Sequence, residues 1–261
     1  LSLHLVFYKL SKSKAMKGFG NNHRNNKKSI EKKVKGIQKD ELINNALSLH
    51  SNGKIKEASE IYNFLIQNKI YDPRVLNNLG SIYSQIKQFD KAILLFNESI
   101  KKFPNSLEAY TNLASILVIK GRSDTAKNIL NKAIELNPNY LKPYSNLASI
   151  YVGEGDFKEA EVLLRKSVGI NSKDVNTLVN LGCVLKDLGK PKEAEKFLRN
   201  ALKINPTYEI VLTNLGSVLN ELEKIEEGER YLRKALNINP ASPMALNLSL
   251  IHISEPTRLL A

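Results

Sequence analysis

The chain has 261 residues, of which 39 are Lys or Arg and 26 are Asp or Glu, so its formal net charge is +13. Hydrophobic residues make up 42% of the chain, enough to bury a substantial core. No apolar run approaches the roughly 18 residues that a membrane-spanning helix requires, which excludes an integral membrane protein. The single cysteine, Cys183, cannot form an internal disulfide and favours a cytoplasmic location. The four histidines are scattered, so we expect neither a metal site nor another cofactor.

The first segment of the chain has an unusual composition. The sequence begins with Leu1, and we expect residues 1–15 to be translated upstream sequence, with Met16 as the start. Residues 16–38 are rich in Lys, Asn and Gly, lack apolar periodicity and predict a disordered basic arm. The arm is either a solvated leader or a contact for an anionic partner such as nucleic acid, ribosome or membrane surface. Because much of the net charge lies in this arm, nucleic-acid binding by the rest of the chain is not expected.

The last segment also differs from the rest. Residues 248–258 read LSLIHISEPTR, which is the translation of an adapter used in transposase-based sequencing libraries. We therefore expect 248–261 to be an artefact, although a natural tail with this sequence is the alternative. On this interpretation the natural protein continues beyond Asn247.

A 34-residue period runs through residues 39–242. It is defined by Leu-Gly or Leu-Ala doublets, and a small residue follows twelve residues after the Gly or Ala of each doublet. The clearest doublets begin at Leu79, Leu113, Leu147, Leu181 and Leu215. The period divides the chain into six repeats, 39–72, 73–106, 107–140, 141–174, 175–208 and 209–242, and a truncated seventh repeat begins at 243–247.

Each repeat contains two helical patterns separated by a turn. In repeat 107–140, the second pattern places Ala126, Ile129, Leu130, Ala133 and Ile134 on one stripe. Turn-forming glycines separate the two patterns at Gly53, Gly121, Gly155 and Gly189. Small residues allow two antiparallel helices to cross closely, and we expect Gly80 to face Ala92 and Ala114 to face Ala126. One pair cannot bury its apolar stripe alone, so the sequence predicts an all-α, right-handed α-solenoid of antiparallel helix pairs.

This pattern resembles the tetratricopeptide repeat family, with the doublets, the small residues and helix-ending prolines such as Pro104 and Pro138 in the family's slots. The chain departs from the pattern at Ile70 and Ser172, which replace prolines, at Glu223, which replaces the turn glycine, and at Asn45, which replaces a leucine. The resemblance implies a superhelix in which the first helix of each repeat lines a concave groove. It also implies an interaction scaffold without cofactor.

One residue before each doublet position is an asparagine, a set that we call the asparagine row: Asn44, Asn78, Asn112, Asn146, Asn180 and Asn214. One turn later lie the small residues Ser81, Ser115, Ser149, Cys183 and Ser217. An amide offers two donors and an acceptor, so a spaced row could pair with the backbone of an extended polypeptide. The row is similar to that of the repeat domain of O-GlcNAc transferases. The alternative is that Asn is simply frequent at this position in the family and in a chain rich in Asn and Lys.

The residues preceding the row bear on the kind of ligand. Family members that clamp acidic tails carry Lys or Arg beside the asparagine, whereas this chain has Ile43, Asn77, Thr111, Ser145 and Val179. That type of ligand is therefore disfavoured.

No catalytic motif is visible in the chain, and the solitary His50 is expected to be a solvated or packed imidazole. Cys183 is expected to be an unreactive thiol, with a reactive thiol as the alternative because Lys186 lies one helical turn away. We expect a non-enzymatic scaffold that binds a protein or peptide in extended conformation. The alternative is the substrate-recognition region of a larger glycosyl-, sulfo- or methyltransferase. The sequence does not specify an oligomeric state.

Overall fold

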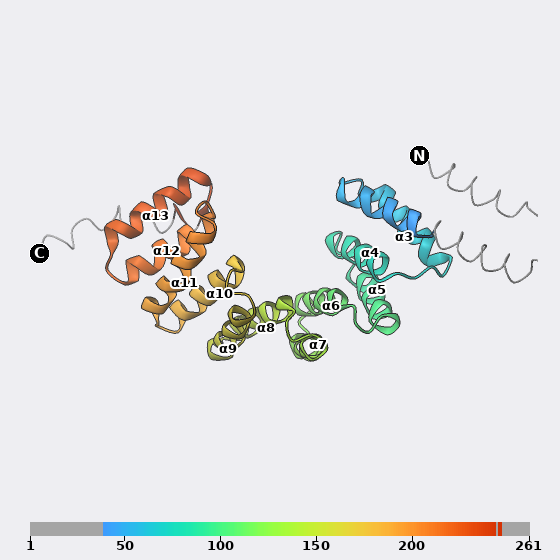
Figure 1. Cartoon of the computed structure of the whole chain (residues 1–261), viewed down its shortest axis with the longest axis horizontal. Coiled ribbons are helices and arrows are strands. Elements are labelled where there is room, and N and C mark those ends of the chain that lie inside the picture. Colours follow the sequence, from blue (N-terminus) through green and yellow to red (C-terminus); the bar gives the residue numbers. More distant parts are fainter. Residues whose placement is uncertain (1–38, 244, 247–261) are drawn as a thin grey trace, which may run out of the picture. The chain divides into compact units, whose positions relative to one another are not determined.

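The computed structural model describes residues 39–243, 245 and 246 (Figure 1). The predictions for segments 1–15, 16–38 and 248–261 therefore fall outside the described residues. The chain divides into an N-terminal body, Leu1–Tyr71, and a C-terminal body, Asp72–Ala261, and each is described by itself.

The described part of the N-terminal body is a helical pair. Residues 39–51 are helical, and α3 follows at Ile55–Gln67. The core of this body consists of fully buried side chains: Ile43, Ala46, Ala58, Tyr62 and Leu65. His50 packs edge-on against the Tyr62 ring, with 6.1 Å between ring centroids, and its Nδ1 atom lies 3.5 Å from the Tyr62 hydroxyl. This histidine is therefore a packed side chain.

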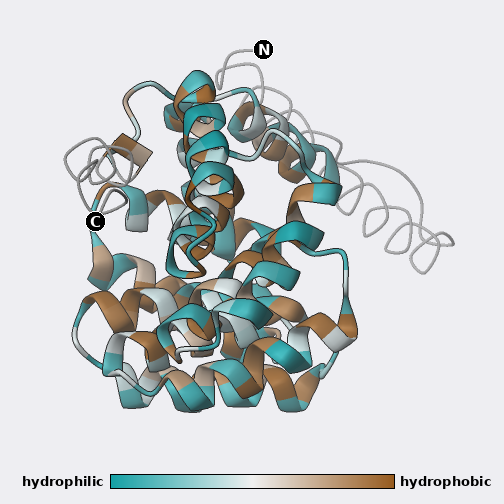
Figure 2. Ribbon diagram, turned by 90° about the vertical axis from the view of Figure 1, so that its left-hand side faces the viewer, coloured by the Kyte–Doolittle hydropathy of each residue, from teal (hydrophilic) through white to brown (hydrophobic). Residues whose placement is uncertain are grey.

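The C-terminal body consists of helices of 13 or 14 residues joined by short turns. Its helices are α4 (Pro73–Gln85), α5 (Phe89–Lys102), α6 (Leu107–Ile119), α7 (Ser123–Leu136), α8 (Leu141–Glu154), α9 (Phe157–Ile170), α10 (Val175–Asp187), α11 (Pro191–Ile204), α12 (Glu209–Glu221) and α13 (Ile225–Ile238). The first helix of each pair begins 34 residues after the preceding one. Apolar and polar residues alternate along these helices, as expected of amphipathic helices (Figure 2).

Packing follows the order of the chain. Each helix from α4 to α13 contacts the next helix, and the first helices α4, α6, α8, α10 and α12 also contact one another. Pairs therefore stack on pairs, as expected when one pair cannot bury its apolar stripe alone. The described residues contain no strand, and the predicted all-α solenoid is confirmed.

Close helix crossings depend on the small residues of the doublets, and the nearest side chain lies one helical turn beyond the predicted partner. A Cβ atom added to Gly80 would lie 2.6 Å from Phe96 Cε1, so the aromatic ring of Phe96 fills the space over Gly80. Gly182 is covered in the same way by Leu198, at 2.7 Å. The residue one helical turn after the small residue therefore makes the close contact, because side chains on a helix lean along its axis.

The turn inside each repeat contains one residue in the left-handed conformation. Glycine occupies this place at residues 53, 121, 155 and 189, with φ between 70° and 85°. Lys87 and Glu223 occupy the same place in the other two repeats, with φ of 59° and 60°. The missing glycine at Glu223 therefore leaves the turn intact, at the cost of strain that glycine does not have.

Candidate functional site

The asparagine row lies on the first helix of every repeat. Asn44 belongs to the helix of residues 39–51, and the other five lie on α4, α6, α8, α10 and α12. Asn44 and Asn180 are exposed, Asn78, Asn112 and Asn146 are half-buried, and Asn214 is buried. Within the C-terminal body, accessibility therefore varies along the row.

The centre of the row opens into a cavity of about 210 Å³ between α6 and α8. Three predicted site residues, Ser115, Asn146 and Ser149, line this cavity together. The two serine hydroxyls donate to carbonyls of their own helices, Thr111 O and Ser145 O, at 3.0 Å each. The Asn146 amide makes no hydrogen bond with any described residue, so its two donors and its acceptor are available to a ligand.

Asn112 and Asn214 are less available than Asn146 and the exposed Asn180. Asn112 Nδ2 donates to Ser81 Oγ at a long 3.5 Å, which links α6 to α4. Asn214 is only 8% exposed and donates to the Ile210 carbonyl of its own helix at 2.8 Å. Ser217 is 7% exposed. A ligand could therefore reach Asn146 and Asn180 more easily than Asn214.

Exposed apolar side chains flank the cavity, and the sequence analysis did not identify them. Val118 lines it, Val152 follows Ser149 by one helical turn, and both are more than a third exposed. Ile119 at the end of α6 is the most exposed of the three. Apolar side chains beside free amides suit a polypeptide, which presents both a polar backbone and apolar side chains.

Cys183 stands in the serine position on α10 and is half-buried. Burial raises the pKa of its thiol above the ordinary value, Lys186 acts in the opposite sense, and Asp187 raises it further. A nucleophilic cysteine needs a lowered pKa, so this thiol is not activated.

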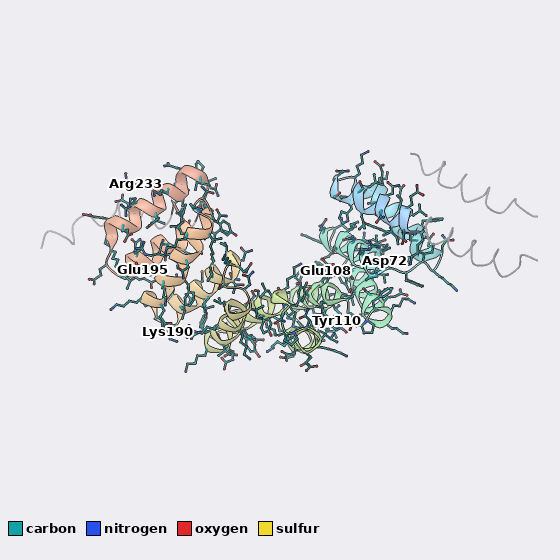
Figure 3. All side chains as sticks on the ribbon, viewed as in Figure 1. Asp72, Glu108, Tyr110, Lys190, Glu195 and Arg233 are labelled. Atoms are coloured by element: carbon teal, nitrogen blue, oxygen red, sulfur yellow. The ribbon has the colours of Figure 1, made fainter. Side chains whose placement is uncertain are left out.

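A second feature that sequence reasoning missed is a chain of ion pairs between neighbouring second helices. Arg165 on α9 binds Glu161 of its own helix at 2.8 Å and Glu193 of α11 at 2.6 Å. Lys190, at the turn before α11, returns to Glu161 at 2.8 Å. The same arrangement recurs 34 residues later, where Arg199 binds Glu195 and Glu227, and Lys224 binds Glu195 (Figure 3 labels Lys190 and Glu195). Only the pairs four residues apart within a helix are visible in the sequence.

These ion pairs shift the titration of their carboxylates. Hydrogen bonds from Lys190 and then Arg165 hold the pKa of Glu161 below its ordinary value, although burial acts against them. Burial also raises the pKa of Glu195, but hydrogen bonds from Lys224 and Arg199 outweigh it, so the pKa is again lowered. Both carboxylates therefore stabilise the junctions in the charged form.

Two other kinds of site are absent from the part of the chain that the structure describes. None of the described helices is both long and apolar enough to cross a bilayer. The same residues contain no cluster of three or more His, Cys, Asp or Glu side chains that could hold a metal ion.

Family models match most of the chain. The model described as the Psidin N-terminal TPR repeats region matches residues 21–136. Three models described as tetratricopeptide repeat match residues 117–178, 175–208 and 211–242. No curated protein matches the sequence.

Many solved structures share the fold. YrrB, described as a TPR protein with an unusual peptide-binding site, is 21% identical with a TM-score of 0.55, over 72% of this chain and 97% of YrrB. Pseudomonas aeruginosa pilF is 13% identical with a TM-score of 0.70, over 82% of this chain and 97% of that protein. A thermophilic TPR protein from Thermus thermophilus is 23% identical with a TM-score of 0.55, over 70% of this chain and 98% of that protein. At these identities the likeness concerns the fold alone.

Proposed function

Because the chain belongs to the tetratricopeptide repeat family, a family of protein-interaction scaffolds, we propose that it binds an extended polypeptide along the asparagine row. The observation that carries this proposal is the cavity between α6 and α8, where Ser115, Asn146 and Ser149 meet. The small serines leave space there, and the amide of Asn146 is free of hydrogen bonds with described residues.

The proposed grip acts on the ligand backbone. A carboxamide accepts from a backbone N–H with its oxygen and donates to a backbone C=O with its nitrogen, so it satisfies both polar groups of one extended residue. Asn146 on α8 and the exposed Asn180 on α10 occupy equivalent positions of neighbouring repeats. Contacts of this kind do not depend on the ligand sequence. The exposed side chains of Val118 and Val152 then favour ligands that have apolar side chains next to the residue bound by Asn146.

The recognition region of a larger transferase would use the same groove, so this alternative shares the proposed contacts. The two proposals differ only in whether the bound polypeptide is then presented to a catalytic domain.

The test is the triple variant Asn112→Ala, Asn146→Ala and Asn180→Ala. Binding is measured by fluorescence anisotropy with a panel of labelled twelve-residue peptides of unrelated sequence. Each lost amide contact costs about 1 kcal/mol net, so the triple variant should bind all peptides roughly a hundredfold more weakly. Circular dichroism should show unchanged helicity.

The matched control removes three exposed asparagines from second helices, Asn97, Asn131 and Asn200, again to alanine. It should bind as the parent chain does. Equal binding by both triple variants would overturn the proposal.

A further inference from the structure

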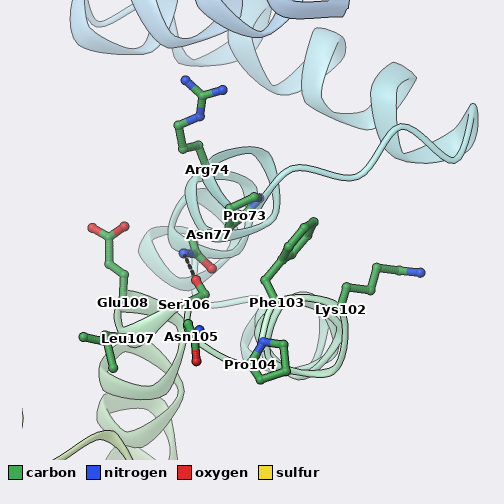
Figure 4. Close-up of a pocket in the computed structure, with 10 residues that line it drawn as sticks. All are labelled: Pro73, Arg74, Asn77, Lys102, Phe103, Pro104, Asn105, Ser106, Leu107 and Glu108. Atoms are coloured by element: carbon green, nitrogen blue, oxygen red, sulfur yellow. Dashed lines mark hydrogen bonds between the residues drawn. The ribbon is translucent and has the colours of Figure 1, made fainter. Parts of the chain in front are cut away.

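A second cavity, of about 610 Å³, lies at one edge of the C-terminal body. It is formed by the start of α4, the end of α5 and the turn that leads into α6 (Figure 4). Pro73, Phe103, Pro104 and Leu107 give it apolar walls. The volume is in the range of pockets that hold small molecules or large side chains.

One buried amide in this cavity has an unused acceptor. Asn77 on α4 is only 3% exposed, and its Nδ2 donates to Ser106 Oγ at 3.0 Å (Figure 4). Its Oδ1 is buried and has no hydrogen-bond partner among the described residues. A buried carbonyl oxygen without a donor disfavours the folded state, so a donor supplied by a ligand would stabilise it.

At the equivalent positions of other repeats, the side chain is either hydrogen-bonded within its own helix or apolar. Thr111 donates to the Glu108 carbonyl and Thr213 to the Glu209 carbonyl, each at 3.0 Å and each within its own helix. Val179 has no polar atom to satisfy. Asn77 thus lines a cavity and is the member of this set whose buried acceptor has no partner among the described residues.

The chemistry of the cavity selects the donor. An anion is excluded, because a carboxylate or phosphate would meet the lone pairs of Asn77 Oδ1. Three charged residues lie at the rim of the cavity: Arg74, Lys102 and Glu108. The Arg74 side chain forms an ion pair with Asp72 at 3.0 Å and points away from Asn77, and Glu108 is exposed (Figure 4). The residues that line the cavity include no buried carboxylate that could pair with an ammonium or guanidinium group. A cation that entered the cavity would therefore lose its hydration without compensation. A neutral donor remains.

The walls narrow the choice further. Phe103 and the two prolines offer flat apolar surfaces, against which an aromatic ring packs better than a small polar side chain. We propose that this cavity receives a tyrosine or tryptophan side chain of the bound polypeptide, whose O–H or N–H donates to Asn77 Oδ1. The inference rests on the proposed function, since it names a side chain of that ligand, but it concerns residues outside the asparagine row.

The test compares N-acetyl-L-tyrosinamide, N-acetyl-L-phenylalaninamide and N-acetyl-L-argininamide as probes. Each is titrated at millimolar concentration into the full chain labelled with ¹⁵N, and the side-chain amide resonances of Asn77 are followed by NMR. The tyrosine probe should shift these resonances and bind roughly three- to tenfold more tightly than the phenylalanine probe, which lacks only the hydroxyl donor. Equal affinity of these two, tighter binding of the arginine probe, or no shift with any probe would overturn the proposal.

Two variants locate the effect. Asn77→Thr and Asn77→Val copy residues found at the equivalent position of other repeats, and either should abolish the preference for tyrosine without lowering the melting temperature. The backbone-amide spectrum reports binding in these variants, and a tyrosine preference that survives in a folded variant would contradict the assignment. The triple variant of Asn112, Asn146 and Asn180 should retain the preference. That result separates failure of the row from failure of this cavity.

Discussion

Residues 73–140 and 141–208 each contain two repeats, built from helices of 13 or 14 residues at the same 34-residue spacing, but the two regions are joined differently. In the later repeats, Glu161 and Arg165 on α9 reach α11, and their counterparts 34 residues on reach α13. In the earlier repeats the same positions hold Ile93 with Asn97 and Lys127 with Asn131. The earlier repeats instead pair Lys120 with Asp90 and Lys127 with Glu154. The arginine-centred network of the later repeats is therefore not required for stacking. The apolar crossing within each pair is common to both regions.

The largest expected effect tests this shared crossing. Ala126 on α7 and Ala160 on α9 are fully buried, one in each region. Replacing either by leucine should overpack the crossing and lower the free energy of unfolding by about 1–3 kcal/mol. Urea unfolding followed by circular dichroism measures the loss, and Ala241→Leu at an exposed position is the control. A loss in only one region would show that the crossings are not equivalent.

The last described pair departs from this shared crossing and predicts the next effect. Gly228 stands where the other C-terminal repeats have alanine, and a Cβ there would collide with Asn220 Oδ1. Both polar atoms of the Asn220 amide are buried without a partner among described residues. Gly228→Ala should therefore destabilise the chain by about 1–2 kcal/mol, a loss that urea unfolding measures.

A double variant reverses this effect. Asn220→Val copies the equivalent Val118 and Val152 and removes the unsatisfied amide. Combined with Gly228→Ala, it should recover most of the stability lost in Gly228→Ala alone, because the carboxamide that the new methyl group meets is gone and only the close Gly216 carbonyl oxygen, 3.0 Å from the new Cβ, remains. Additive effects of the two changes would show that the two side chains do not collide.

The charge network can be tested through its pH dependence. The pKa of Glu195 is lowered in the folded state, so its contribution is present above the ordinary pKa and is lost as pH falls through the folded-state value. Glu195→Gln should cost about 1 kcal/mol at pH 7 and less at about pH 3, where protonation of the carboxylate has begun to remove its contribution. The control is Glu159→Gln on α9, an exposed carboxylate for which the structure gives no ion pair with a described residue. Equal costs at both pH values would contradict a role for the charge.

Periodicity alone predicted the helix pairs, because small residues, turn glycines and prolines all recur at 34 residues. It also singled out Ser115, Asn146 and Ser149, which line one cavity in the structure. It did not predict that Phe96 covers Gly80, that Asn214 is buried, or that Asn77 has an open acceptor. These features depend on rotamers and on contacts between neighbouring helices, which a one-dimensional pattern does not encode.

The smallest expected effect concerns the turns. Lys87 and Glu223 adopt the left-handed conformation that glycine has in the other repeats. Lys87→Gly or Glu223→Gly should raise the free energy of unfolding by about 0.5 kcal/mol through relief of strain. Thermal unfolding measures the gain, and Gly121→Ala, at φ 72°, should produce a loss of similar size. A gain in that control would refute the strain argument.

The central claim is that the asparagine row contacts a bound polypeptide. The most direct measurement is the ¹⁵N NMR spectrum of asparagine side chains during titration with a twelve-residue peptide of extended conformation. The account predicts that the amide resonances of Asn112, Asn146 and Asn180 shift together, while those of Asn97, Asn131 and Asn200 on the second helices do not. Shifts confined to the second helices would contradict it.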